Sequence, residues 1–373
     1  MNAQALASVS LRKTSTPTPT SSTPSLLGSG VAEEKERHRR LRECDLEAWY
    51  ERLSSFTFPT SFLPLSQETA TALMEAYAVF LSSPPSPSPI LPAILDQLSP
   101  SHATLLTTLI STIDSTLTLP PFSSHSTPSV FAKLSSRSPK DSKVCEKKAL
   151  TSIISTLSST PPQELDPNTI FAVVMEAGIA ALECTTGEEV VEMMISSDRV
   201  CSDDIPLALE HASSSWSQHL VLRSWVSLPP WCELRGFVCN GVLTGLSQYF
   251  VGVVFPELIE KKDQIQAAVL AFFDQVSPSL GLDDCVLDLA LEESPDDGGL
   301  NVYIIEINPF GPPDGMGTGT GLFDLSDPDD AAILFGTPPA FEFRIQSTPL
   351  STLTHLVRPD TPLGSFLTSH DLL

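Results

Sequence analysis

"NVYIIEINPFG", residues 301–311, is an apolar run that contains two polar side chains and ends on proline. Side chains of a β-strand alternate between its two faces, so Glu306 and Asn308 share one face and the neighbouring isoleucines lie on the other. Proline cannot donate a hydrogen bond to a strand neighbour, so Pro309 marks the end of the strand. An edge strand with one solvated face explains this pattern as well as a binding site does.

A second strand precedes this one, and the two are expected to form a hairpin. The segment "LEESPDDGGLN" (291–301) is typical of a turn, centred near Asp297, between two apolar runs. Residues paired across a hairpin have position numbers with a constant sum, here about 594, which places Asp288 opposite Glu306. Directly opposed residues point to the same face, so Asp288, Glu306 and Asn308 are expected together. A slip of one residue would turn one strand over and separate them.

Three oxygen-bearing side chains on one sheet face suit a hard divalent cation. Mg²⁺ takes oxygen ligands, typically one or two carboxylates together with phosphates and water. Two carboxylates on one face repel each other unless a cation compensates, so Asp288 favours the metal site over the solvated edge strand. Phosphates would need cations opposite the metal. Lys133 in a short strand and Arg235 in "ELRGFV" are candidates, although each alone is more often a surface cation.

The composition limits the class of protein. The chain has 373 residues, enough for two domains, and its 41% of hydrophobic residues supports a core. It has 21 Lys and Arg against 45 Asp and Glu, a net charge of −24. This charge argues against a nucleic-acid partner and favours a cationic partner or cations.

The cysteines and the N-terminus indicate a cellular compartment. Seven cysteines without any C-x-x-C spacing fit a reducing compartment and argue against a zinc site. The N-terminus has no apolar signal segment, and no apolar run reaches about 18 residues. We therefore expect a cytoplasmic protein without a membrane span. Arg12 and Lys13 among serines and threonines resemble a transit peptide, but nearby prolines would break its helix.

Four parts are expected along the chain. Residues 1–31 are rich in Ser, Thr and Pro and should be disordered. Residues 32–218 should hold N-terminal helices and a small lobe, with a Ser/Pro-rich low-complexity insertion around a helix at about 82–129. Residues 219–346 should form a C-terminal lobe with the metal site. Residues 347–373 should be a flexible tail.

Hydrophobic periodicity predicts the individual elements. Helices are expected at 33–53, 67–81, 103–117, from 166 or 168 to 182, and at 255–280. Extended segments are expected at 56–66, 219–228, 233–250 and 285–308, and 129–142 should be a short strand followed by a polar loop. The Asn-Gly pair at 240–241 is typical of a tight hairpin turn. The order hairpin, helix, hairpin predicts an α+β protein with mainly antiparallel sheets.

Eight of these segments, in this order, resemble the ATP-grasp fold. They more specifically resemble the cell-division-cycle family of assembly chaperones for eukaryotic translation initiation factor 2. Each stretch is weak alone, but the eight in sequence are specific and span about 45–345 with gaps at the Ser/Pro insertion. The stretches are "WYERLSSFTFPTSFLPL" (49–65), "VFAKLSSRSPKDS" (130–142), "ISSDRVCSDDI" (195–205), "LRSWVSLPPWCELRGFV" (222–238), "GLSQY" (245–249), "VLDLAL" (286–291), "VYIIEINPFG" (302–311) and "GLF" (321–323).

The resemblance implies a two-lobed ATP-grasp protein that binds ATP and Mg²⁺. Lys133 would touch the nucleotide phosphates from the small lobe, and Arg235 would face them. The strand "LVLRSW" (220–225) would be the hinge between the lobes. The implied sets are backbone groups of Val221, Leu222 and Arg223 for the adenine, and Asp288, Glu306 and Asn308 for Mg²⁺, with Asp288 also beside the nucleotide.

Three positions depart from the family pattern. Ile195 stands just before "SSD", where the family usually has a lysine, so one nucleotide-facing cation is missing. Glu306 stands where the family usually has aspartate, which keeps the charge. The tryptophan expected after "LF" is absent from "LFDLSD" (322–327).

Three functions are consistent with the sequence. The resemblance implies a chaperone, and not an enzyme, that binds ATP, Mg²⁺ and the gamma subunit of initiation factor 2 and has a role in cell-cycle progression. We expect a monomer without nucleic-acid or membrane partners. The alternative is an ATP-grasp ligase that forms an acyl-phosphate, because metal and cations would stabilise developing phosphate charge. The third is a scaffold without nucleotide, which a lack of ATP binding would select.

Overall fold

The computed structural model describes residues 36–37, 39–83, 90–124, 128–210, 216–294, 298–336, 341–349, 352–353, 357, 361–370 and 372. The predicted disordered tail, 1–31, lies outside the described residues. So do most of the Ser/Pro segment 82–89 and the predicted turn centre at Asp297.

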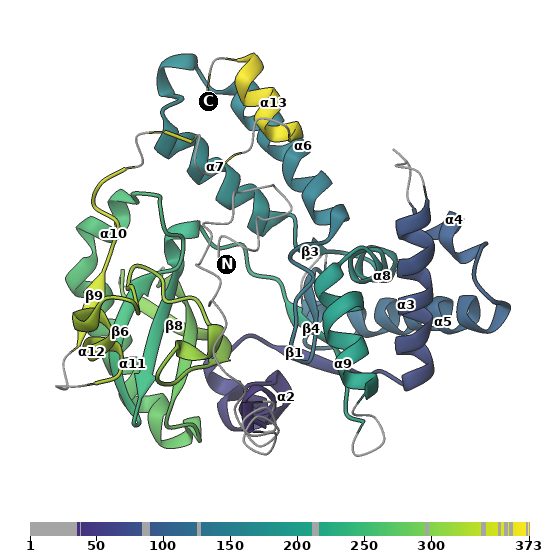
Figure 1. The fold of residues 1–373 in the computed structure, drawn as a ribbon, viewed down its shortest axis with the longest axis horizontal. Coiled ribbons are helices and arrows are strands. Elements are labelled where there is room, and N and C mark those ends of the chain that lie inside the picture. Colours follow the sequence, from purple (N-terminus) through teal and green to yellow (C-terminus); the bar gives the residue numbers. More distant parts are fainter. Residues whose placement is uncertain are drawn as a thin grey trace, which may run out of the picture.

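Two sheets form the two lobes of the molecule (Figure 1). The small sheet has the strand order β1-β4-β2-β3 and is antiparallel, while the large sheet has the order β8-β7-β5-β6-β9 and is antiparallel except for the β6–β9 pair. The predicted α+β class is confirmed. The strands are β1 (Thr60–Pro64), β2 (Val130–Leu134), β3 (Glu183–Cys184), β4 (His219–Ser224), β5 (Glu233–Cys239), β6 (Val242–Gln248), β7 (Cys285–Glu293), β8 (Leu300–Pro309) and β9 (Glu342–Arg344).

Helices pack around both sheets. Helices α3, α5 and α8 pack on one another beside the small sheet, and α11 packs on β8 (Figure 1). No described helix combines the length and the apolar composition needed to cross a bilayer. The helices are α2 (Leu46–Leu53), α3 (Gln67–Ser82), α4 (Leu91–Leu95), α5 (Pro100–Leu117), α6 (Lys143–Ser159), α7 (Pro167–Ala180), α8 (Gly187–Ile195), α9 (Ile205–Glu210), α10 (Pro256–Glu260), α11 (Lys262–Leu280), α12 (Pro328–Leu334) and α13 (Pro362–Ser369).

The two hairpins of the large sheet confirm the predicted order of hairpin, helix, hairpin. The β5–β6 turn has positive φ at Asn240 (50°) and Gly241 (73°), as an Asn-Gly hairpin turn requires. Between the hairpins, the predicted helix 255–280 is divided at Lys261 into α10 and α11. The predicted helix 33–53 is similarly interrupted, because residues 44–45 leave helical geometry before α2 begins.

The boundary between the lobes differs from the prediction. The C-terminal lobe was expected from residue 219, but β4 lies between β1 and β2 in the small sheet. The large sheet begins only with β5 at Glu233. The reason is pairing at long sequence distance, which strand periodicity does not reveal.

The predicted low-complexity insertion is part of the small lobe. Helices α4 and α5 lie within 82–129, and both pack on α3 and α8. Four of their apolar residues, and Phe122 in the turn that follows α5, are fully buried; the four are Leu91, Ile94, Leu106 and Ile113. The helix predicted at 103–117 is present as α5, and Thr and Ser occupy mainly its exposed face, so the insertion is more extensively packed than its composition suggests.

The predicted flexible tail also contains packed structure. Helix α13 contacts α6, and its Leu363 and Leu367 are buried. The prediction of a flexible tail for 347–373 is wrong at this helix, because the apolar spacing of a short amphipathic helix was overlooked.

Candidate functional site

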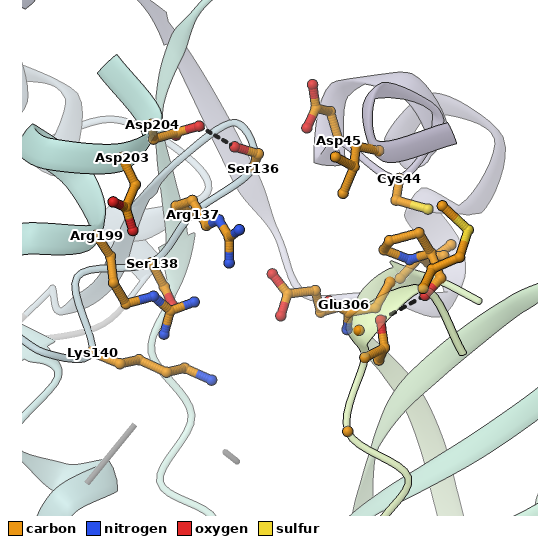
Figure 2. Close-up of a pocket in the computed structure, with 18 of the residues that line it drawn as sticks. Cys44, Asp45, Ser136, Arg137, Ser138, Lys140, Arg199, Asp203, Asp204 and Glu306 are labelled. Atoms are coloured by element: carbon orange, nitrogen blue, oxygen red, sulfur yellow. Dashed lines mark hydrogen bonds between the residues drawn. The ribbon is translucent and has the colours of Figure 1, made fainter. Parts of the chain in front are cut away.

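A cavity of about 650 Å³ lies between the lobes (Figure 2). Its walls come from the N-terminal helical segment, the loop after β2, the turn after α8, the end of β8 and the loop that follows β8. Seven of the 21 Lys and Arg residues of the chain line it: Arg37, Arg42, Arg137, Lys140, Lys143, Arg199 and Arg235. Six carboxylates line the same cavity: Asp45, Asp141, Asp198, Asp203, Asp204 and Glu306. Cations therefore slightly outnumber acids here, unlike in the whole chain with its net charge of −24, and this local difference favours an anionic ligand.

The opening strand supplies the acidic side of the cavity. Asp288 on β7 pairs with Glu306 on β8, which confirms the predicted register. The register shifts by one residue after this pair, so Ile305 is the extra residue of a β-bulge. Asn308 Nδ2 donates to Asp288 Oδ2 at 3.0 Å. The three predicted side chains therefore lie together, and Glu306 and Asn308 line the cavity.

Asp288 lies behind the cavity wall and holds Arg235. Their strands pair directly, and Arg235 donates from Nε and Nη2 to the two carboxylate oxygens at 2.7 and 2.9 Å. Arg235 also donates to the Gly319 carbonyl at 2.8 Å, and its guanidinium lies 4.9 Å from the centre of the Tyr249 ring. Both members of the Arg235–Asp288 pair are buried. Arg235 therefore faces the cavity, but as half of a bidentate ion pair.

Lys133 connects the two lobes. It lies on β2, is buried, and donates from Nζ to Glu306 Oε1 on β8. Burial alone would raise the pKa of Glu306, but the charges of Lys133 and Lys140 outweigh it and hold this pKa well below its usual range. The Glu306 carboxylate is therefore ionised at neutral pH and available to a cation.

The residues predicted to meet the adenine lie elsewhere. Val221 and Leu222 are fully buried in β4, and the backbone of β4 pairs with β1 on one side and β2 on the other. A strand paired on both sides has no free backbone donors or acceptors. The prediction for Val221, Leu222 and Arg223 is not supported, because none of them lines the cavity.

Arg223 has a different part in the structure. Its guanidinium donates to the carbonyl of the bulged Ile305 and to Thr57 Oγ1, the latter at 2.6 Å. Burial lowers the pKa of Arg223 to about 10. The strand predicted to be a hinge is thus fastened to β8 of the opposite lobe by a buried side chain.

Sequence reasoning missed most of the cations in the cavity. Arg137 and Lys140 lie in the loop after β2, and Arg199 begins a π-helical turn, Arg199–Asp204. π-Helical turns occur frequently at functional sites. Burial lowers the pKa of both Lys140 and Arg199. Both segments belong to stretches that resemble the family, but the sequence alone does not show that a cation in a polar loop faces a cavity.

Two of the departures from the family pattern lie away from the cavity. Ile195 is fully buried at the end of α8, within the small-lobe core. Phe323 of "LFDLSD" packs on Phe237, and the Arg344 guanidinium lies 4.1 Å from the centre of its ring. Neither position lines the cavity.

The donor set fits Mg²⁺ by its chemistry. Glu306 and Asn308 present oxygen donors to the cavity, which hard cations prefer. Among the described residues no group of three or more His, Cys, Asp or Glu could hold a metal ion, so phosphate or water oxygens would complete the coordination. Both oxygens of Asp288 accept hydrogen bonds from Arg235 or Asn308. Oδ2 accepts two of these bonds and Oδ1 accepts one, so Oδ1 keeps a lone pair that could meet an ion.

Two mainly antiparallel sheets on either side of a charged cavity are consistent with an ATP-grasp-like fold. The structure is similar to that of Cdc123 from Schizosaccharomyces pombe, with a TM-score of 0.50, 18% sequence identity and coverage of 82% of this chain and 96% of that chain. A C-terminally truncated form of the same protein gives the same TM-score with 20% identity. At these identities the similarity establishes the fold alone.

The sequence comparisons point to one family. The D123 family model matches residues 172–329. A translation initiation factor eIF2 assembly protein of Xenopus laevis is 27% identical over 143 residues, and one of Dictyostelium discoideum is 32% identical over 98 residues. These matches cover 35% and 26% of this chain, and 39% and 26% of the two relatives. The resemblance seen in the sequence is confirmed, over a part of the length of these relatives.

Proposed function

We propose that the chain binds Mg·ATP in the cavity between its lobes and acts as an assembly factor. The observation that carries the proposal is the collection of one third of the chain's basic residues around Glu306 and Asn308. Glu306 and Asn308 would hold Mg²⁺, which neutralises phosphate charge when bound. Asp288 orients Asn308 and Arg235 through its three hydrogen bonds. Lys133 fixes Glu306 from the opposite lobe.

Mg·ATP binding is expected to depend on Asn308. Asn308→Ala removes an oxygen donor from the cavity, while Asp288 keeps both hydrogen bonds to Arg235, so the variant should fold. We expect at least a tenfold loss of Mg·ATP affinity by isothermal titration calorimetry, the loss of about one good charge-assisted contact. Asn301→Ala is the control, because Asn301 is exposed near the start of the same strand. Affinity that is independent of both Mg²⁺ and Asn308 would remove the metal from the proposal.

The names of the relatives extend the proposal to a partner. Proteins named for the assembly of eIF2 match this chain over part of their length. We propose that this chain promotes assembly of eIF2 in the cytoplasm by binding the gamma subunit, with a consequence for cell-cycle progression. The proposal assigns no reaction to the chain. A ligase would instead consume ATP in proportion to an added acceptor.

The association rate with the gamma subunit is expected to fall with salt. A net charge of −24 attracts a basic partner surface over a distance that salt shortens about threefold between 0.05 and 0.5 M. The dissociation rate should change less, because apolar contacts are not screened. Surface plasmon resonance with the purified subunit measures both rates. An association rate that does not respond to salt would mean that the negative charge contributes to solubility and does not speed association. If the gamma subunit does not bind at all, the proposal that it is the partner is refuted.

A further inference from the structure

Two arginines from different segments lie on the same wall of the cavity. Arg137 belongs to the loop after β2, and Arg199 begins the π-helical turn after α8. Figure 2 shows both side chains, with Lys140 beside them, projecting from the small-lobe wall toward the side where Glu306 lies. Two guanidinium groups therefore face the same space.

Neither guanidinium has a partner among the described residues. No hydrogen bond or ion pair joins the side chain of Arg137 or Arg199 to another described residue. Burial and then the like charge of Arg137 lower the pKa of Arg199, and the charges of Glu306, Asp141 and Asp203 offset this only in part. The acids nearby therefore compensate the two arginines incompletely, and an anion bound between the guanidinium groups would lower the electrostatic free energy further.

The two segments are locked together by buried polar contacts. Asp141 accepts from Ser197 Oγ with one carboxylate oxygen and from the backbone N–H of Arg199, at 3.0 Å, with the other. The hydroxyls of Ser142 and Ser196 lie 2.7 Å apart, and both residues are buried. The backbone at Arg199 is thereby fixed to the loop that carries Arg137. The like charges are thus held close by the fold and do not come together by chance on a mobile surface.

The geometry points to a two-arginine clamp, formed by Arg137 and Arg199, that binds one phosphate or carboxylate group. Each guanidinium presents parallel N–H donors that match two oxygens of such a group. The clamp deepens the proposed function, since it lies in the proposed nucleotide cavity. The anionic group can belong to the nucleotide itself or to a second ligand, and the chemistry of recognition is the same for both.

The test compares variants that remove the charge with variants that keep it. Arg137→Ala and Arg199→Ala remove one cation each, while Arg137→Lys and Arg199→Lys keep the charge but lose the planar fork. Arg39→Ala is the control, since Arg39 is exposed and pairs with Glu36 and Glu43 outside the cavity. Melting temperatures should be unchanged or raised in the alanine variants, because one of two repelling charges is gone. A residue needed only for folding would lower them.

Three ligands are titrated into each variant by calorimetry: Mg·ATP, AMP and inorganic phosphate. Phosphate is titrated twice, once alone and once with the nucleotide site saturated by Mg·AMP-PNP. Alanine variants that bind Mg·ATP at least about tenfold more weakly, and AMP normally, would assign the clamp to a phosphate of the nucleotide. Variants that bind Mg·ATP normally but no longer bind phosphate beside Mg·AMP-PNP would assign it to a second ligand. In both cases the lysine variants should be intermediate.

Two further results separate the clamp from the proposed function. The wild-type chain could bind phosphate but no nucleotide, and the alanine variants could fail to bind phosphate. This result would support the clamp and refute the nucleotide site. If all variants bind every probe as the wild type does, or if the wild type binds neither phosphate nor nucleotide, the clamp is refuted.

Discussion

Asp288→Ala is expected to lower the free energy of unfolding by about 3–5 kcal/mol, the cost of leaving a buried charge without its partner. Asp288 is the sole carboxylate within 4.0 Å of the Arg235 guanidinium among the described residues, and both side chains are buried. Truncation would leave that buried cation at the cavity wall without a carboxylate partner. Chemical denaturation followed by circular dichroism measures the loss.

Two other variants test the cause. In Asp288→Leu/Arg235→Met both charges are replaced by apolar side chains, and the double variant should be more stable than Asp288→Ala. Glu292→Ala, at the exposed end of the same strand, should change the free energy of unfolding by less than about 1 kcal/mol. If Asp288→Ala and Glu292→Ala have the same free energy of unfolding, the Arg235–Asp288 ion pair does not stabilise the sheet.

This result revises what the sequence alone suggests for Asp288. From the hairpin face, Asp288 is a metal ligand whose removal abolishes nucleotide binding and leaves the fold intact. The structure gives the same residue a second duty, because its oxygens are already bonded to Arg235 and Asn308. Loss of nucleotide binding in Asp288→Ala would therefore not show whether Asp288 binds the metal or only positions Arg235 and Asn308. Asn308→Ala is the better test of the metal site.

The parts of the site that lie on regular strands were predictable from the sequence. The period of two places Glu306 and Asn308 on one face, and the predicted pairing of Asp288 with Glu306 agrees with the observed strand pairing. The bulge at Ile305 was not foreseen, because an extra residue leaves no mark in an alternating pattern. It lies between the turn and the Asp288–Glu306 pair. Paired positions sum to 593 nearer the turn and to 594 from this pair onward, so without the bulge Asp288 would face Ile305.

The rest of the site depends on contacts that local patterns do not encode. Arg137 and Arg199 come from an irregular loop and a π-helical turn, two segments that hydrogen bonds of Asp141 and Ser142 join. Leu222 was assigned from resemblance to a hinge, but its strand is central in the small sheet. Strand order is set by pairing between residues far apart in sequence, so neither feature follows from the segment that contains it.

Asp45→Asn is expected to stabilise the protein, and to do so more strongly as the pH rises. Asp45 lies just before α2 and is buried, and its Oδ1 has no hydrogen-bond partner. Its Oδ2 accepts a long contact, 3.3 Å, from Arg42. Burial raises the pKa of Asp45 to about 7, Arg42 lowers it, and the charges of Glu47 and Asp204 raise it further. The ionised carboxylate is thus poorly accommodated in the folded chain.

The direction of the pH dependence follows from proton binding. Unfolded, Asp45 has the ordinary pKa of 3.8, and folded its pKa is about 7. Between these values the folded chain binds more protons than the unfolded chain, so the free energy of unfolding falls as pH rises through this window. The penalty becomes small below about pH 4, because the carboxyl of the unfolded chain then also becomes protonated, and it vanishes by about pH 3. Above about pH 7 the penalty is complete, at most about 4 kcal/mol for a shift of roughly three units.

The measurement is therefore a difference between two stability curves. Asp45→Asn and the wild type should unfold with equal free energies near pH 3, and the variant should gain about 2–4 kcal/mol by pH 8. Asp203→Asn is the matched control, because Asp203 lines the same cavity but is exposed, and it should change stability by less than about 0.5 kcal/mol. A constant difference across pH would mean that Asp45 does not titrate in this window. A variant less stable than the wild type at pH 8 would mean that the contact with Arg42 outweighs burial, and that the carboxylate belongs to the structure of the cavity wall.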